Sequence, residues 1–95
     1  MKTINTQNKE LILKDKKVVV KFGHQFCNPC KIYEQMLNTL PPELELYSCD
    51  TMENVEWASS LGLRAVPTTI LFDNGQEVSR LVGIQSKDTV LKLFE

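Results

Sequence analysis

The chain has 95 residues, of which 42% are hydrophobic and 24% charged, and its formal net charge is -1 at pH 7. We expect one domain spanning residues 1–95, because a chain of this length holds a single hydrophobic core. The balanced charge argues against a nucleic-acid partner, and no apolar run approaches the roughly 20 residues of a membrane helix. The N-terminal residues are polar and lack the hydrophobic region of a signal peptide, so a cytoplasmic protein without membrane contact is expected.

Short strands and helices are predicted to alternate along the first two thirds of the chain. A strand at 3–5 and a helix at 8–13 come first, and the β-branched run 17–22 predicts a strand buried on both faces. Ile32, Met36, Leu37 and Leu40 then follow helical spacing until Pro41-Pro42. The alternating run 44–49 predicts another strand. A short helix over 55–61 follows, with Gly62 as its C′ residue.

The last third of the chain predicts a hairpin and a final helix. Residues 68–72 form a strand, Asp73-Asn74-Gly75 supplies the turn, and 77–82 return as the partner strand. Ser86 is a candidate cap for a helix carrying Val90, Leu91 and Phe94. The predicted order βαβαβαββα indicates an α/β fold with a central mixed sheet flanked by helices.

Cys27 and Cys30 are the residues most indicative of chemistry. They lie between a buried strand and an amphipathic helix, so both thiols meet unpaired N–H groups and the positive end of the helix dipole. Cys27 comes first, at the end of the loop, where a partner's disulfide can reach it. Cys30 follows in the first helical turn on the same side, placed to attack a mixed disulfide. Pro29 fits an early helical position, where its missing N–H costs nothing.

The alternative is that Cys27 and Cys30 are two of the four ligands of a zinc site. A structural zinc site needs four ligands, and only Cys49 and His24 remain, with no second close-spaced pair. Three cysteines also make a disulfide scaffold a poor fit, because one thiol is left over. Redox chemistry is therefore favoured, and we expect neither a metal ion nor another cofactor.

Three further residues have competing interpretations. His24 is either a tuner of the Cys27 thiolate or an ordinary surface histidine of the loop, and the second is the commoner case. Cys49 is expected to be a small buried strand residue and less readily a regulatory thiol. Trp57 is expected to pack in the core or partly at the surface, without serving as a binding anchor.

The chain resembles the thioredoxin family across nearly its whole length. The matching features are the strand at 18–22, the run Phe26-Cys27-Asn28-Pro29-Cys30, Val66-Pro67-Thr68, the segment Phe72-Asp73-Asn74-Gly75, and Gly83. The resemblance implies a thioredoxin fold and a thiol–disulfide oxidoreductase that reduces protein disulfides and receives electrons from a reductase or another thiol donor.

The resemblance also implies a substrate-binding surface. Its residues would be Phe26, Asn28, Pro29, Val66 and Pro67. Pro67 would be cis and lie against the active-site disulfide, and the backbone beside it would pair with an extended substrate chain. The alternative for Pro67 is an ordinary proline at the entry to a strand.

The sequence departs from the family pattern at the charged positions. Lys21 stands where the family has a buried acid, Leu46 aligns with a buried lysine of the next strand, and Asn28 replaces a glycine. Lys21 is expected to be part-buried, with its ammonium reaching the rim near the active-site loop. There it would favour the thiolate form of the pair and slow resolution by Cys30. The alternative is that Lys21 points into solvent and shifts nothing.

Two other functions compete with a thioredoxin-like reductase. A glutaredoxin-like protein shares the cysteine pair and a proline after valine, but Phe72-Asp73-Asn74-Gly75 and the single Gly83 favour a thioredoxin. A thioredoxin-fold subunit that only binds another protein is the second alternative, and such modules often lose a cysteine. The expected protein is a monomer with protein disulfide substrates.

Overall fold

The structure, a computed structural model describing residues 1–95, is built on one five-stranded sheet. The elements in chain order are β1 (Lys2–Thr3), α1 (Lys9–Leu13), β2 (Lys17–Gly23), α2 (Asn28–Leu37), β3 (Leu46–Asp50), α3 (Val55–Ser60), β4 (Thr68–Asp73), β5 (Gln76–Val82) and α4 (Lys87–Lys92). This is the order predicted from the sequence. None of the helices is long and apolar enough to cross a membrane.

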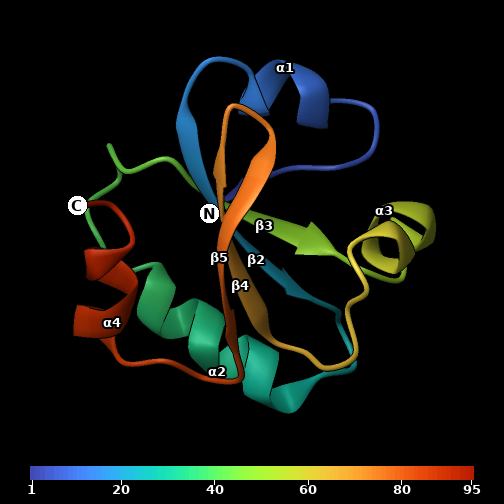
Figure 1. The fold of residues 1–95 in the computed structure, drawn as a ribbon. Coiled ribbons are helices and arrows are strands. Elements are labelled where there is room, and N and C mark those ends of the chain that lie inside the picture. Colours follow the sequence, from blue (N-terminus) through green and yellow to red (C-terminus); the bar gives the residue numbers. More distant parts are fainter.

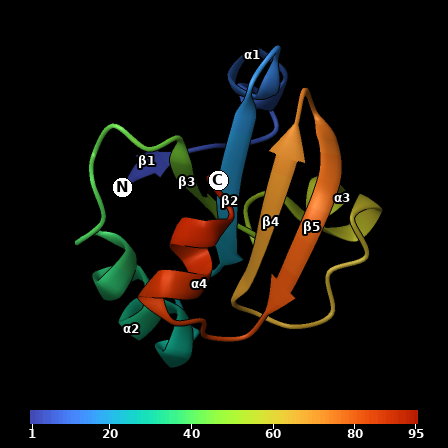
Figure 2. The same ribbon diagram turned by 60° about the vertical axis from the view of Figure 1, so that its left-hand side comes forward.

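The sheet is mixed, with β2 at its centre. Its strand order is β1-β3-β2-β4-β5, and Figure 2 shows β5 at the outer edge beside β4. β2 runs parallel to β3 and antiparallel to β4, while β4 and β5 form the predicted antiparallel hairpin. Six of the seven residues of β2 are buried, as expected for a strand covered on both faces.

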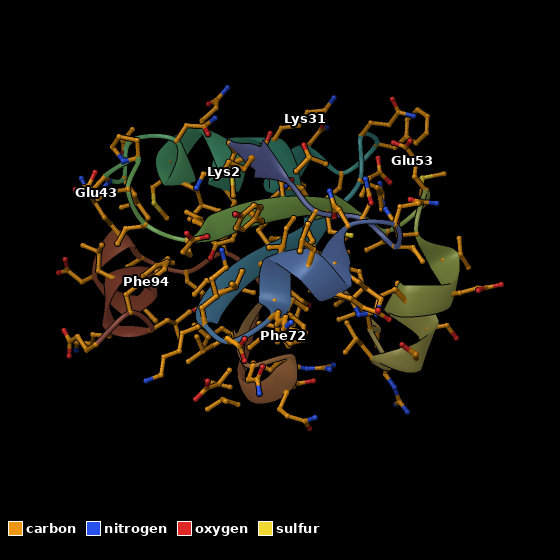
Figure 3. The ribbon with its side chains drawn as sticks, turned by 90° about the horizontal axis from the view of Figure 1, so that it is seen from above. Lys2, Lys31, Glu43, Glu53, Phe72 and Phe94 are labelled. Carbon is orange, nitrogen blue, oxygen red and sulfur yellow. A yellow bond between two sulfur atoms is a disulfide. The ribbon has the colours of Figure 1, made fainter.

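The helices cover the two faces of the sheet in pairs. α1 and α3 lie on one face, and α2 and α4 lie on the other (Figures 1 and 2). Two separate apolar clusters follow from this arrangement. Beneath α1 and α3, the cluster includes the rings of Phe22, Trp57 and Phe72. On the other face, Tyr33, Leu37 and Val90 pack with the partly buried Phe94, labelled in Figure 3.

Aromatic packing confirms the expectation that Trp57 belongs to the core. Trp57 is 7% exposed, and its ring centroid lies 5.2 Å from that of Phe22 in an edge-to-face arrangement. Phe72 completes the group, with its centroid 6.0 Å from that of Trp57. The edge-to-face contact between Trp57 and Phe22 is favourable because the positive edge of one ring meets the negative face of the other.

The apolar face predicted for α2 needs one correction. Ile32 is 62% exposed, whereas Tyr33, one residue later, is completely buried. The Tyr33 hydroxyl forms a hydrogen bond of 2.7 Å with Thr69 Oγ1, which makes its burial possible. Leu37 and Leu40 are buried as predicted, and Met36 is partly buried.

Turns and caps follow the residue types that predicted them. Asn74 and Gly75 take positive φ values of 49° and 82° between β4 and β5, which suits the twist of a hairpin. Gly62 takes φ of 66° directly after the C-cap Leu61 of α3. The Ser86 side chain accepts a hydrogen bond from the Thr89 N–H and caps α4.

Candidate active site

A disulfide between Cys27 and Cys30 occupies the start of α2. β2 ends at Gly23, and a short loop leads to Cys27, which is the N-cap of the helix. The Cys27 Sγ accepts a hydrogen bond of 3.1 Å from the Cys30 N–H, so a free backbone donor of the first turn points at this sulfur. Asn28 and Pro29 form the first two helical positions, as predicted.

The two sulfurs of the disulfide are unequally covered. Cys27 is 8% exposed and Cys30 is 2% exposed, so an incoming thiol meets Cys27 first. Phe26 is 71% exposed immediately before it, and Asn28 and Pro29 are exposed immediately after it. His24 is half-buried in the loop, and its Nδ1 accepts a hydrogen bond of 3.2 Å from the Phe26 N–H. This histidine therefore orders the loop, a contact that the sequence did not predict.

The segment before β4 is brought against the disulfide. The Val66 carbonyl oxygen lies 4.0 Å from Cys27 Sγ, although the residues are 39 positions apart in the chain. The Val66–Pro67 peptide bond is cis, as the family resemblance implied. Pro67 is buried, and its carbonyl accepts a hydrogen bond of 2.8 Å from the Gly83 N–H. The Val66 carbonyl thus lies beside Cys27, whereas Lys21 lies on the side of Cys30, near Gly23.

Lys21 lies inside the protein and not at the rim. Its side chain is 6% exposed, and its Nζ is 2.8 Å from Glu34 Oε1 on α2. The alternative that Lys21 points into solvent is therefore wrong, and the expected part-burial underestimates the burial found. The partner Glu34 was missed by sequence reasoning. Its position four residues after Cys30, on the same helix face, was the available signal.

Hydrogen bonds depress the pKa of Glu34. Burial alone would raise this pKa, but hydrogen bonds from Lys21 and Ser48 outweigh that effect and hold the pKa below its ordinary value of 4.5. Glu34 is therefore a carboxylate at neutral pH. By contrast, the buried hydroxyl of Tyr33 has a raised pKa, because burial disfavours phenolate more than the bond with Thr69 favours it.

A cavity of about 300 Å³ lies beside Cys30. Residues lining it include Lys21, Gly23, His24, Cys30, Glu34 and Asp50. Lys31 also borders it and points away from the sheet on the outer side of α2 (Figure 3). Side chains of both charges thus line the same cavity as the buried Cys30.

Cys49 is the one cysteine outside the disulfide. It is 1% exposed on β3, and burial, followed by the nearby Asp50 charge, raises its pKa to about 12. This confirms the expectation of a small buried strand residue. A thiol with so high a pKa is a poor nucleophile at neutral pH, because thiolate is the reactive form.

The family model and the most similar relatives of this chain all belong to one family. A family model described as thioredoxin matches residues 1–95. Thioredoxin from Chlamydia muridarum is 37% identical over 80 residues, covering 81% of this chain and 78% of its own. Thioredoxin from Rickettsia felis is 30% identical over 93 residues, covering 94% of this chain and 89% of its own.

Solved structures agree at the level of the fold. Fasciola hepatica thioredoxin superposes with a TM-score of 0.83 at 27% identity, covering 99% of this chain and 97% of its own. Chlamydomonas reinhardtii thioredoxin f2 has a TM-score of 0.86 at 24% identity, covering 99% of this chain and 93% of its own.

Proposed function

The chain belongs to the thioredoxin family of thiol–disulfide oxidoreductases, and from this premise we propose that Cys27 attacks protein disulfides and that Cys30 resolves the product. The observation that carries the division of roles is the unequal environment of the two sulfurs. Cys27 is the more exposed, caps the helix and receives the Cys30 N–H, which favours its thiolate. Cys30 is covered and forms the disulfide with Cys27.

The reaction has two exchange steps. In the first, the Cys27 thiolate forms a bond to one substrate sulfur, and the substrate disulfide breaks with release of the other sulfur as a thiolate. In the second, the Cys30 thiolate attacks Cys27 Sγ, and the mixed disulfide breaks. The substrate leaves as a dithiol after taking up two protons from solvent. The two cysteine thiols lose two protons, the same number that the substrate takes up. The enzyme ends in the disulfide form.

The substrate is proposed to lie across Phe26, Asn28, Pro29, Val66 and Pro67. Phe26, Asn28 and Pro29 offer an exposed surface on one side of Cys27, and Val66 borders it on the other. An extended chain placed between them could pair with the backbone at Val66 while its sulfur faces Cys27.

Lys21 is proposed to tune the cysteine pair. A buried ammonium behind Cys30 favours a thiolate there, because opposite charges at short range stabilise the ionised form.

We further propose that the protein works in the cytoplasm as a monomer, with a reductase or another thiol donor restoring its dithiol. One chain supplies both cysteines and the segment at Val66–Pro67, so the site needs no second copy. The free thiol of Cys49 is typical of a protein in a reducing compartment.

Insulin reduction with dithiothreitol as the electron donor tests the function. The wild-type protein should speed the precipitation of insulin chains, and Cys27→Ser should leave only the rate of dithiothreitol alone. A protein that binds insulin without reducing it would instead be a binding subunit. Replacing dithiothreitol by glutathione separates a glutaredoxin-like protein, which glutathione should reduce efficiently, from the thioredoxin proposed.

A further inference from the structure

A row of polar side chains crosses the sheet beneath the first turns of α2. Lys21 on β2 is paired in register with Ser48 on β3 and with Thr69 on β4. Lys21 and Ser48 both bond to Glu34, and Thr69 bonds to Tyr33. The helix segment that follows Cys30 is therefore fixed to the sheet by hydrogen bonds and one ion pair, and not by apolar packing alone.

Lys21 and Cys30 face the same small space beside Gly23. A methyl group added to Gly23 would lie 2.9 Å from Cys30 Sγ and 3.5 Å from Lys21 Nζ. The charged or titratable groups around this space are Lys21 on β2, Glu34 and Lys31 on α2, His24 in the loop, and Asp50 and Cys49 on β3. Among these groups, Lys21 and Glu34 form an ion pair.

One carboxylate oxygen of Glu34 makes both of its contacts with the sheet. Its Oε1 receives Lys21 Nζ at 2.8 Å and Ser48 Oγ at 2.9 Å. Asp50 is already engaged elsewhere, because its Oδ1 accepts from the Met52 and Glu53 N–H groups. In the reduced protein a Cys30 thiolate would be a second anion near the same ammonium, so Glu34 and Cys30 would compete for it.

We propose that Glu34 is a positioning residue that acts on Cys30 through Lys21. Its carboxylate holds the ammonium behind the disulfide and offsets part of its charge, so that the Cys30 thiol ionises less readily than it would beside an unpaired lysine. The inference extends the role proposed for Lys21. Its consequence is a more reducing protein, because a less stable thiolate makes the reduced state less stable.

Charge-neutral variants test the inference through the ionisation of Cys30. The readout is the pH titration of the Cys30 ¹³Cβ resonance in the reduced protein, which requires no access of a reagent to the buried sulfur. Lys21→Met should raise the apparent pKa by about one unit. Glu34→Gln, which keeps an oxygen acceptor for Lys21 and Ser48, should lower it. The double variant Lys21→Met/Glu34→Gln should match Lys21→Met, because Glu34 acts on Cys30 through the lysine that this variant lacks.

Glu45→Gln is the matched control, because Glu45 also pairs with a lysine, Lys16, at 3.3 Å near the start of β2. It should leave the Cys30 titration unchanged. The redox equilibrium with glutathione gives a second readout, in which Glu34→Gln should favour the reduced form several-fold. Glu34→Asp keeps the charge and should stay closer to wild type than Glu34→Gln in both readouts.

The outcomes separate the two proposals. Suppose that Lys21→Met shifts the Cys30 pKa, but Glu34→Gln raises this pKa or shifts it no more than Glu45→Gln does. That result overturns the role of Glu34 alone. No movement in Lys21→Met overturns the tuning role of Lys21 and the role of Glu34 with it. Loss of insulin reduction by the wild-type protein would be a separate failure, since neither titration depends on turnover.

Discussion

At the scale of single residues, Cys27 and Cys30 have the same chemistry and different surroundings. One sulfur lies at the helix cap beside Phe26 and Val66, and the other faces Lys21 and the cavity. The residue types and their spacing were enough to predict the disulfide chemistry and its position at the start of the helix. The sequence placed Lys21 near the pair, but its ion pair with Glu34 was not predicted, because that contact depends on how α2 packs against β2.

Serine substitutions should separate the two roles. Cys27→Ser should reduce turnover to the background rate, because the attacking thiolate is lost. Cys30→Ser should accumulate a mixed disulfide with substrate, because no second thiol can release it. Non-reducing electrophoresis and mass measurement after incubation with insulin would detect the adduct. Normal insulin reduction by Cys30→Ser would contradict the two-thiol mechanism.

Cys49→Ala should have little effect on catalysis. Cys49 is buried on β3, and its raised pKa of about 12 keeps it as a thiol at neutral pH. Insulin reduction should stay near the wild-type rate, and the free energy of unfolding should fall by about 1 kcal/mol at most for so small a truncation. Loss of most activity would show that this thiol participates in the reaction.

At the scale of elements, strand alternation predicted the sheet better than helical spacing predicted the buried face of α2. Five strands were found where β-branched or alternating runs indicated them, with bounds shifted by one or two residues. In α2, Ile32 appeared apolar enough for the core, yet Tyr33 occupies the buried position. Tyrosine could not be assigned there from sequence, because its burial depends on Thr69, which reaches it from a distant strand.

Pro67→Ala tests the segment that enters β4. We expect insulin reduction to fall by about ten- to a hundredfold, because a small displacement of Val66 relative to Cys27 disturbs the reacting geometry. The protein should still unfold cooperatively in urea, so that the loss of activity exceeds any loss of stability. Urea denaturation measured beside the insulin assay distinguishes the two effects. Equal losses in both would assign Pro67 a structural role only.

At the scale of the whole molecule, charged contacts add to the apolar clusters that hold the elements together. Glu34 links α2 to β2 and β3, and Arg80 within β5 pairs with Glu77. A hydrogen bond from Arg80 lowers the pKa of Glu77, and the pKa of Glu34 is lowered although burial alone would raise it. Both carboxylates therefore bind protons less readily in the folded protein than in the unfolded chain.

Acid should destabilise the protein through these groups. A carboxylate with a depressed folded pKa contributes its full stability above its ordinary value of 4.5, and the contribution is lost as the pH falls through the folded pKa. Urea midpoints should therefore decline below pH 4.5, and the decline should be shallower in Glu34→Gln. Identical slopes for the variant and the wild type would show that Glu34 makes no such contribution.

The aromatic group beneath α1 and α3 gives the protein an optical property of its own. Trp57 is the only tryptophan in the chain, and it is sealed against Phe22 and Phe72. Because the residue before Cys27 is Phe26, no indole lies in the loop that would touch a substrate. Indole emission therefore comes from one buried site, on a different element from the cysteines. It would shift to longer wavelength when that core opens, which makes the protein its own unlabelled reporter of unfolding.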